Sequence, residues 1–374
     1  MNLNNIKNKL KLVWLSDFAI HGSGYLNLSL PLINGLVERG HEVKAAGLGY
    51  RGEPHNYNFG IIPASNLQES LAIINNLHGL WEFDALVVAL DIPIQERLLN
   101  RIEGRSFKYI GIMPVEADPL CLSWAMALMQ MDKALIISQF GTDEANKVGV
   151  PAEHLQLGID TEAWRIPTEE ERKTIRTNMM GFEDDTFAVL TVADNQERKH
   201  LSRAMEIFAD FAKDKPNARY VLVTREHNPV GWRLRDYAQL LGINGQLMIF
   251  ERGMGFKELW SIYAACDAFL LTSKAEGLGL PLLEAMAVGL PCIATNCTAI
   301  SEVLGDRRGH LIDVDYVHTD PFGNGHRYFC NREDGTELLN SIYTHGFDVS
   351  LGRKYVEDRA WDIAVNHLEK ALSE

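Results

Sequence analysis

Apolar runs and polar turns alternate along this chain with the spacing of strands followed by helices. Residues 11–16 form a short apolar run typical of a buried strand, and residues 26–37 then carry apolar side chains at helical spacing. Arg39 and Gly40 are typical of a helix end, and residues 41–46 resemble a second strand. A strand, a helix and a strand in this order predict a βαβ unit with a right-handed crossover.

The same alternation continues to the end of the chain. Residues 314–333 show no clear period, and we predict an irregular insertion that carries histidines and aromatic residues. Residues 351–373 have the spacing of one final amphipathic helix. Further strands are predicted at 84–90, 108–113, 133–138, 187–193, 220–224, 246–250, 268–272, 291–295 and 311–313. Alternating strands and helices over 374 residues indicate an α/β protein with two parallel-sheet domains.

The most informative stretch is 273–291, which follows the buried strand predicted at 268–272. Gly277 and Gly279 allow the backbone to turn tightly and to approach a ligand. Pro281 suits the first helical position, where a missing N–H has no cost. The helix that follows is apolar nearly all round, so we expect it to be buried.

Two carboxylates lie within this apolar stretch, Glu276 on the loop and Glu284 in the first turn of the helix. A buried carboxylate is costly without a partner, so each should have one. The free N–H groups of a helix start also attract an anion. Together these groups could hold the phosphate and the hydroxyl groups of a sugar nucleotide. The alternative is a packing unit in which both glutamates bond to the backbone.

The run from Glu276 through Glu284 to Pro291 resembles the Glu-x7-Glu signature of retaining GT-B glycosyltransferases, glycosyltransferase family four. The resemblance implies a GT-B fold, in which two Rossmann-like, doubly wound parallel-sheet domains face a central cleft. It also implies a catalytic role for Glu276 near the reacting sugar and a donor-binding role for Glu284 near the ribose. The loop residues expected to bind the donor are Gly277, Leu278, Gly279 and Leu280.

The domain boundary follows from a second resemblance. Residues 155–164 are similar to the family segment that ends the first domain. We therefore predict an N-terminal acceptor domain at 1–165 and a C-terminal donor domain at 166–350. In resembling enzymes a final helix crosses back onto the first domain, and we assign it to 351–374.

Two adjacent cations, Arg198 and Lys199, lie between a predicted strand and a predicted helix. A guanidinium and an ammonium at such a position suit a diphosphate. The family has a lysine at the place of Lys199, often with an arginine five residues earlier, where this chain has Asp194. We expect Lys199 and Arg198 to be catalytic by stabilising the charge of the leaving diphosphate. A charge pair on a solvated face is the alternative.

The first loop offers two further candidates, Gly24 for the donor and His21 for the acceptor, because in the resembling family this loop faces the cleft. Gly22-Ser-Gly24 could be mistaken for a dinucleotide fingerprint, but Asn27 stands where a third glycine is required. A nicotinamide dehydrogenase is therefore disfavoured.

Three acids, Asp91, Glu116 and Asp118, come directly after predicted strands. Ligands of open α/β sheets bind at that edge, so these carboxylates are candidates for holding acceptor hydroxyls. Many family members have a histidine in the loop that holds Glu116 here, and this chain has none there. The alternative for each acid is a solvated turn residue.

The composition of the chain limits the acceptors, cofactors and cellular locations that we expect. The net charge of −14 disfavours a nucleic-acid acceptor, and no apolar run reaches the ~20 residues of a transmembrane helix. The N-terminus lacks the apolar core of a signal peptide. The five cysteines are scattered and form no Cys-x-x-Cys, which suits a reducing, cytoplasmic location. Asp313 and Asp315 form an Asp-x-Asp pair like that of the metal-dependent GT-A fold, but we expect a turn there and no metal cofactor.

These observations predict a hexosyltransferase that moves a sugar from a nucleotide-diphosphate sugar to an acceptor hydroxyl, with retention of configuration and without a metal. The acceptor could be a glycan, a lipid-linked molecule or a small molecule. Two alternatives share the donor pocket. One is a GT-B sugar-nucleotide epimerase or hydrolase, and the other is a non-catalytic protein that binds a sugar nucleotide or glycan.

Overall fold

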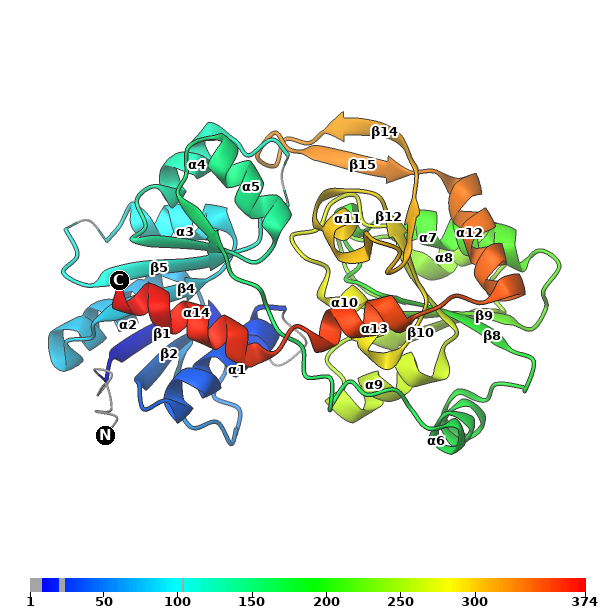
Figure 1. The fold of residues 1–374 in the computed structure, drawn as a ribbon, viewed down its shortest axis with the longest axis horizontal. Helices are drawn as coiled ribbons and strands as arrows, with labels where there is room; N and C mark the ends of the chain where they lie inside the picture. The colour runs from blue at the N-terminus through cyan, green and yellow to red at the C-terminus, as the bar shows by residue number, and fades with distance from the viewer. Residues whose placement is uncertain (1–8, 20–23, 103, 117) are drawn as a thin grey trace, which may run out of the picture.

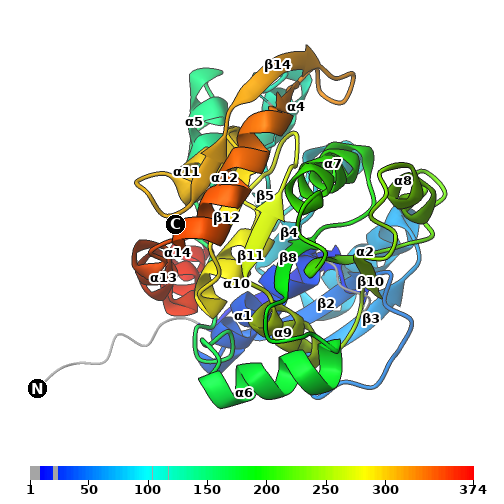
Figure 2. The same ribbon diagram turned by 90° about the vertical axis from the view of Figure 1, so that its right-hand side faces the viewer.

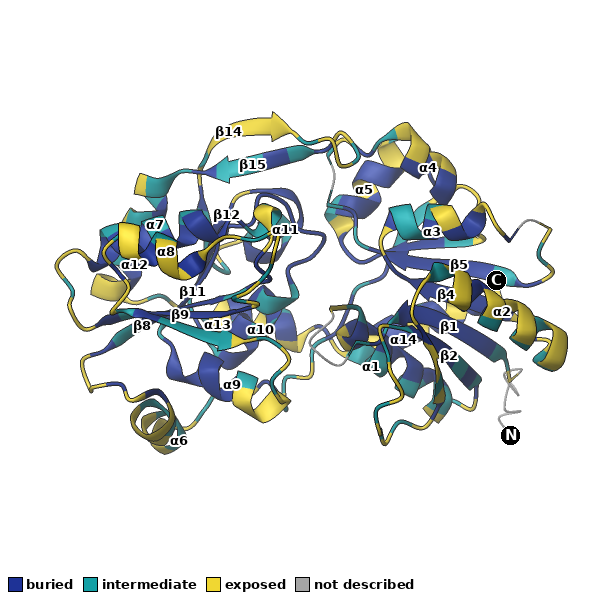
Figure 3. Cartoon of the chain, turned by 180° about the vertical axis from the view of Figure 1, so that it is seen from behind, coloured by how far each residue is buried: buried dark blue, intermediate teal, exposed yellow. Residues whose placement is uncertain are grey.

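The computed structural model describes residues 9–19, 24–102, 104–116 and 118–374. Two α/β domains lie side by side, each with helices packed on both sides of a central parallel sheet (Figure 1). Figure 3 shows that buried residues gather in the strands of both sheets, whereas exposed residues lie on outer helices such as α2 and α6. This architecture confirms the fold class predicted from the alternating strands and helices.

The first domain has a seven-stranded sheet in the order β3-β2-β1-β4-β5-β6-β7, and its paired strands are parallel. The residues Leu12 to Leu15 of β1 are fully buried, because helices cover both faces of the sheet. The strands are β1 (Lys11–Asp17), β2 (Glu42–Leu48), β3 (Gly60–Ala64), β4 (Ala85–Ala89), β5 (Lys108–Met113), β6 (Lys133–Ile136) and β7 (Ala152–His154). The helices are α1 (Gly24–Glu38), α2 (Leu67–Trp81), α3 (Ile92–Leu99), α4 (Leu122–Leu128) and α5 (Gln139–Lys147).

The second domain has a six-stranded parallel sheet in the order β10-β9-β8-β11-β12-β13. Its strands are β8 (Phe187–Val192), β9 (Ala218–Thr224), β10 (Leu247–Glu251), β11 (Ala268–Leu271), β12 (Cys292–Thr295) and β13 (His310–Ile312). Its helices are α6 (Glu169–Thr174), which continues as a π-helix (Ile175–Met180), a 3-10 turn (Glu197–Lys199), α7 (Leu201–Ala212), α8 (Leu234–Leu240), α9 (Phe256–Ala265), α10 (Leu280–Val288), α11 (Thr298–Leu304) and α12 (Arg332–His345). In this sheet β8 pairs with β11, although β9, β10 and the helices α7, α8 and α9 lie between them in sequence.

The prediction of an irregular insertion at 314–333 is wrong. The segment forms an antiparallel hairpin of β14 (Val314–Thr319) and β15 (His326–Cys330), followed by the start of α12. In Figures 1 and 2 this hairpin lies along the edge of the second domain, and its tip reaches toward α4 of the first. Most of β14 is exposed. Its sequence therefore shows only a weak alternation of apolar and polar residues, the pattern by which a half-buried strand is recognised.

The single helix predicted at 351–373 is also wrong, because the structure has two helices there. α13 (Ser350–Glu357) packs on α10 of the second domain, and α14 (Trp361–Ser373) packs on α1 of the first. The chain thus crosses back to the first domain between the two helices (Figure 1). At the break, the Arg359 carbonyl accepts a hydrogen bond of 2.9 Å from the amide of Ile159. This contact comes from a distant segment and was not visible in the local pattern.

None of the helices in the described ranges combines the length and the apolar character needed to cross a bilayer.

Candidate functional site

The candidate site lies at the carboxyl ends of β8 and β11. Arg198 and Lys199 follow β8, and Glu276 follows β11. Because paired parallel strands end at the same edge of a sheet, these side chains meet. Lys199 Nζ lies 2.5 Å from Glu276 Oε1, and Arg198 Nη1 lies 3.3 Å from Glu276 Oε2. The structure therefore brings together the three residues that the sequence nominated as catalytic.

Glu276 is a buried carboxylate with several donors. Ser273 Oγ donates to it over 2.6 Å, and the Glu276 amide donates to Thr298 Oγ1 over 2.9 Å. Burial by itself would raise the pKa of Glu276, but the charges of Lys199 and Arg198 hold that pKa at about 2. Burial and the neighbouring Arg198 lower the pKa of Lys199. The cluster thus keeps a carboxylate ionised between two cations.

Arg198 also reaches the first domain. Its Nη1 lies 3.0 Å from Oε2 of Glu116, the acid that follows β5, and donates to the carbonyl of Ala275 over 2.6 Å. Burial raises the pKa of Glu116, and the charge of Arg198 opposes that rise. One guanidinium therefore contacts a carboxylate from each domain, which places Glu116 beside Glu276.

The glycine loop between β11 and α10 packs directly against the first domain. A Cβ added to Gly277 would lie 2.3 Å from Cβ of Pro114, so no larger residue fits there without a shift. Gly279 has φ +87°, a left-handed conformation that favours glycine, and directly precedes α10. Leu278 is buried in the core, so a ligand at this loop could contact its backbone but not its side chain. A Cβ on Gly24 would lie 4.0 Å from Cδ1 of Leu280, across the domain interface.

Glu284 lies in α10 and is half-buried. Its Oε2 accepts a hydrogen bond of 2.7 Å from the hydroxyl of Tyr263. Burial raises the pKa of Glu284 to about 7, although Tyr263 and the charge of Arg252 both oppose the rise. This carboxyl is therefore divided between its neutral and ionised forms near neutral pH. Both signature glutamates have side-chain partners, as their burial requires.

The remaining first-domain candidates are also paired. Asp91 is exposed and accepts a hydrogen bond of 2.5 Å from the hydroxyl of Tyr25, and Asp118 accepts one of 2.6 Å from Tyr328. Tyr25 belongs to the first turn of α1, and burial together with Asp91 raises its pKa well above the usual value. Sequence reasoning missed Tyr25, although its place next to Gly24 in the first loop was a usable signal. His21 lies outside the described residues.

A second group of charges was missed by sequence reasoning. Asp194, Arg225 and Arg252 follow β8, β9 and β10, which are neighbours in the sheet. Arg225 Nε lies 2.7 Å and Arg252 Nη1 3.4 Å from Oδ1 of Asp194. The aspartate at the position where the family often has an arginine thus holds two arginines from adjacent strand ends. Their separation in sequence hid this arrangement.

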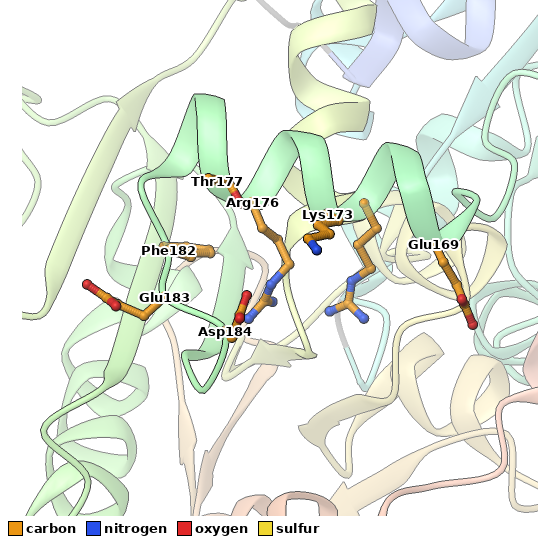
Figure 4. A pocket seen from close by; sticks show the side chains of 8 residues that line it. Glu169, Lys173, Arg176, Thr177, Phe182, Glu183 and Asp184 are labelled. Atoms are coloured by element: carbon orange, nitrogen blue, oxygen red, sulfur yellow. The ribbon is translucent and has the colours of Figure 1, made fainter.

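Two other groups of charged residues lie away from this cluster. Along α6 lies a pocket of 240 Å³, which is lined by charged side chains of both signs (Figure 4). Arg172 and Arg176, which line it, form ion pairs of 2.7 and 3.0 Å with Asp267. The Asp313-x-Asp315 pair stands at the base of the hairpin. There Asp315 accepts from Asn331 and the Asp313 amide donates to Asp334.

Comparison with protein families gives a match to the model of glycosyl transferases group 1 over residues 175–318. One relative is the serotype-specific mannosyltransferase WbdA of Escherichia coli, 25% identical over 175 residues, which are 46% of this chain and 19% of WbdA. The O-antigen chain mannosyltransferase B of E. coli is 46% identical over 108 residues, which are 25% of this chain and 28% of that protein. The N-acetyl-alpha-D-glucosaminyl L-malate synthase of Bacillus anthracis is 24% identical over 82% of this chain and 84% of its own.

Solved structures share the fold at low identity. Sucrose-phosphate synthase of Thermosynechococcus elongatus superposes with a TM-score of 0.77 at 14% identity, over 97% of this chain and 98% of that chain. HepE of Anabaena in complex with UDP-glucose gives a TM-score of 0.76 at 14% identity, over 97% and 99%.

The alignments cover between 19% and 40% of the length of the first four curated relatives, so these relatives extend well beyond the aligned part. The matched residues 175–318 nevertheless include Lys199, Glu276 and Glu284, the residues on which the family resemblance was based. Residues 175–318 of this chain are thus similar to the glycosyl transferases of group 1, and the chain shares the GT-B fold of the solved structures.

Proposed function

We propose that the protein transfers a sugar from a nucleotide-diphosphate sugar to an acceptor hydroxyl, with retention of anomeric configuration. The observation that carries this proposal is the cluster of Lys199, Arg198 and Glu276 beside the open start of α10. Its two cations suit a diphosphate, and its carboxylate suits sugar hydroxyls. The relatives named mannosyltransferase and the UDP-glucose complex of HepE support the same reaction class.

The difficult event is departure of the nucleoside diphosphate, on which negative charge grows as the sugar–phosphate bond breaks. Lys199 and Arg198 are fixed by Glu276 before any donor binds, so little reorganisation is needed when that charge appears. The amides at the start of α10 add donors on the same side. The acceptor oxygen then bonds to the anomeric carbon, and the leaving phosphate oxygen takes its proton.

The two signature glutamates take different parts in this scheme. Glu276, next to both cations, faces the reacting sugar and helps most as charge develops. Glu284 holds hydroxyls of the nucleotide ribose, and such hydroxyls would donate to its carboxylate and favour the ionised form. The backbone of the loop 277–280 and Gly24 lie close to the donor.

The first domain, 1–165, supplies the acceptor site, and residues 166–350 supply the donor site. Glu116, Asp118 and Asp91 are the carboxylates proposed to bind acceptor hydroxyls. Glu116 is favoured because Arg198 holds it beside the donor cluster. We propose that no metal takes part, because Lys199 and Arg198 supply the positive charge. A cytoplasmic location is proposed from the five free cysteines.

The test begins with the donor. A thermal-shift screen over UDP, GDP and ADP sugars should select one class, because ligand at ~100 times its Kd adds about 2.7 kcal/mol to stability. Mannose and glucose nucleotides come first in the screen, given the named relatives and HepE. Transfer to hydroxyl acceptors is then followed by NMR, which reports the anomeric configuration of the product.

The alternatives give other outcomes in the same assay. An epimerase or hydrolase would release an epimer or free sugar without any acceptor. A binding protein would shift in the thermal screen and give no turnover with any acceptor. Inversion in the product would disprove the retaining mechanism while leaving the transferase reading intact.

A further inference from the structure

The hairpin β14–β15 belongs to the second domain in sequence but makes close contacts with the first. At its tip, Phe322 packs edge-on against Trp124 of α4, with ring centroids 5.0 Å apart. A Cβ on Gly323 would lie 2.5 Å from Cη2 of Trp124, so the tip backbone lies directly against this ring. Trp124 is buried, at 8% exposure, and its environment includes the hairpin tip. The hairpin therefore spans the two domains (Figure 1).

Its second strand holds Asp118, one of the proposed acceptor ligands, by two bonds. The hydroxyl of Tyr328 donates to Oδ2 of Asp118 over 2.6 Å, and the amide of His326 donates to the Asp118 carbonyl over 2.8 Å. Burial and the carboxylate of Asp118 raise the pKa of Tyr328, so its hydroxyl keeps the proton that it donates. This hydrogen bond fixes the orientation of the Asp118 carboxylate.

Between these two residues lies Arg327, which is 4% exposed, whereas most of the facing strand β14 is exposed. Its Nε lies 3.6 Å from Oδ2 of Asp320, and its Nη1 donates over 3.4 Å to the carbonyl of Glu116. The charge of Arg327 also lowers the pKa of Glu116, against the rise that burial causes. A buried guanidinium is costly without partners, so its place beside Glu116 is specific.

The same strand is anchored to the donor cluster. The amide of Tyr328 donates to the carbonyl of Lys274 over 2.9 Å, and the amide of Lys274 donates to the carbonyl of Arg198 over 2.8 Å. The Lys274 ammonium lies 4.2 Å from the ring centre of Phe329. The backbone of β15 thus contacts Lys274, two positions before Glu276. The same strand contacts Asp118 through the Tyr328 hydroxyl and the His326 amide.

We propose that the hairpin sets the position of the acceptor loop relative to the donor cluster, with Tyr328 and Arg327 as positioning residues for Asp118 and Glu116. This inference rests on the proposed function, in which these carboxylates bind acceptor hydroxyls. We expect the two side chains to act on acceptor recognition more than on donor binding, because they bond to Asp118 and Glu116 of the first domain, whereas Lys199 and Glu284 bond to Glu276 and Tyr263.

The test compares Tyr328→Phe with Tyr316→Phe. Each change removes one hydroxyl and keeps the ring, but Tyr316 is 53% exposed and stacks on Phe329 at 4.3 Å. Amide exchange should become about tenfold faster at 115–120 in Tyr328→Phe and stay at the parental rate in Tyr316→Phe. Asp118→Asn removes the same charged acceptor from the other side and should resemble Tyr328→Phe in exchange.

Kinetics separate positioning from simple loss of structure. With the donor chosen by the screen and methyl hexosides as acceptor probes, Tyr328→Phe should raise acceptor KM about tenfold. Its donor KM and its calorimetric Kd for UDP or GDP should stay within about twofold of the parent. Arg327→Lys should retain more of the parental acceptor affinity than Arg327→Met, because lysine keeps a positive charge beside Glu116.

Parental exchange at 115–120 in Tyr328→Phe would overturn the inference, as would equal effects of the two tyrosine variants. A matching loss of UDP or GDP affinity would assign the hairpin to the donor site instead. Failure of the proposed function is a separate result: the parent itself would bind none of UDP, GDP and ADP, and the exchange comparison would still decide whether the hairpin orders the loop.

Discussion

The ammonium of Lys199 lies 2.5 Å from the carboxylate of Glu276, although 77 positions separate the two residues in sequence. The pair forms because β8 and β11 are neighbours in the second sheet and end at the same edge. Glu276 therefore neutralises Lys199 in the ligand-free protein, and in the proposed reaction a diphosphate would meet a cation already fixed in place.

Replacing Lys199 by alanine should lower kcat by roughly 10²–10³, the scale for losing one preorganised donor to a developing charge. Arg198 stays next to Glu276 in this variant, so the carboxylate keeps a partner and the protein should still unfold cooperatively. Lys213→Ala is the matched control, since Lys213 is 75% exposed and pairs only locally with Asp210. Steady-state kinetics and calorimetric melting check both variants. Parental kinetics in Lys199→Ala would remove Lys199 from the site.

The two glutamates should fail in different ways. Glu284→Gln should mainly raise donor KM, because contacts to the ribose bind the ground state and the transition state alike. Glu276→Gln should mainly lower kcat, because Glu276 lies beside Lys199 and Arg198, the cations proposed to stabilise the leaving group. Circular dichroism should match the parent in both variants. If both variants simply unfold, the pair holds the turn together and has no separate role in transfer.

The raised pKa of Glu284 gives the ligand-free protein a pH-dependent stability. With a folded-state pKa of about 7 against an unfolded value near 4.5, the folded state binds more protons between these pH values. This contribution is fully present below pH ~4.5 and is lost as pH rises toward about 7. Glu284→Gln should therefore show a smaller fall in Tm between pH 5 and pH 7.5 than the parent. The control is Glu337→Gln at an exposed site on α12. Equal falls in Tm for all three proteins would contradict the assignment.

Gly277→Ala should destabilise the contact between the domains. The added methyl would lie 2.3 Å from Cβ of Pro114, and overpacking of this kind costs about 1–3 kcal/mol. Gly245→Ala provides the control, because nothing lies within 4 Å of the added atom. Denaturant unfolding measures the stability, and X-ray scattering with and without nucleotide measures whether the domains separate. A fully stable Gly277→Ala with an unchanged scattering curve would mean that the loop relaxes without cost.

Chelation should leave transfer unchanged, because in the proposed mechanism Lys199 and Arg198 supply the positive charge that a metal would otherwise provide. Asp313→Ala should likewise keep activity, since the backbone amide that donates to Asp334 of α12 is kept in this variant. Turnover measured with EDTA, with and without added Mn²⁺ or Mg²⁺, checks this. Loss of activity on chelation, recovery with Mn²⁺ and an inactive Asp313→Ala together would establish a metal site.

Local patterns in the sequence determined the class of fold and the core of the candidate site. The apolar run before Gly277 predicted β11, and Gly279 with Pro281 predicted the tight turn into α10, where Gly279 indeed has φ +87°. These features depend on steric limits and periodicity within a few residues, so they can be read without the rest of the molecule. The need of Glu276 and Glu284 for partners also followed from their apolar neighbours.

Only the tertiary structure decided which partners those residues have. The bridge from Arg198 to Glu116 depends on how the two domains meet, and the group of Asp194, Arg225 and Arg252 depends on strand order. Contacts with distant segments also decided the two elements that were predicted wrongly. At the helix break, the Arg359 carbonyl accepts a hydrogen bond from the Ile159 amide, and at the tip of the hairpin Phe322 packs against Trp124. These two contacts join residues that lie far apart in the sequence, so the periodicity of either segment alone does not predict them.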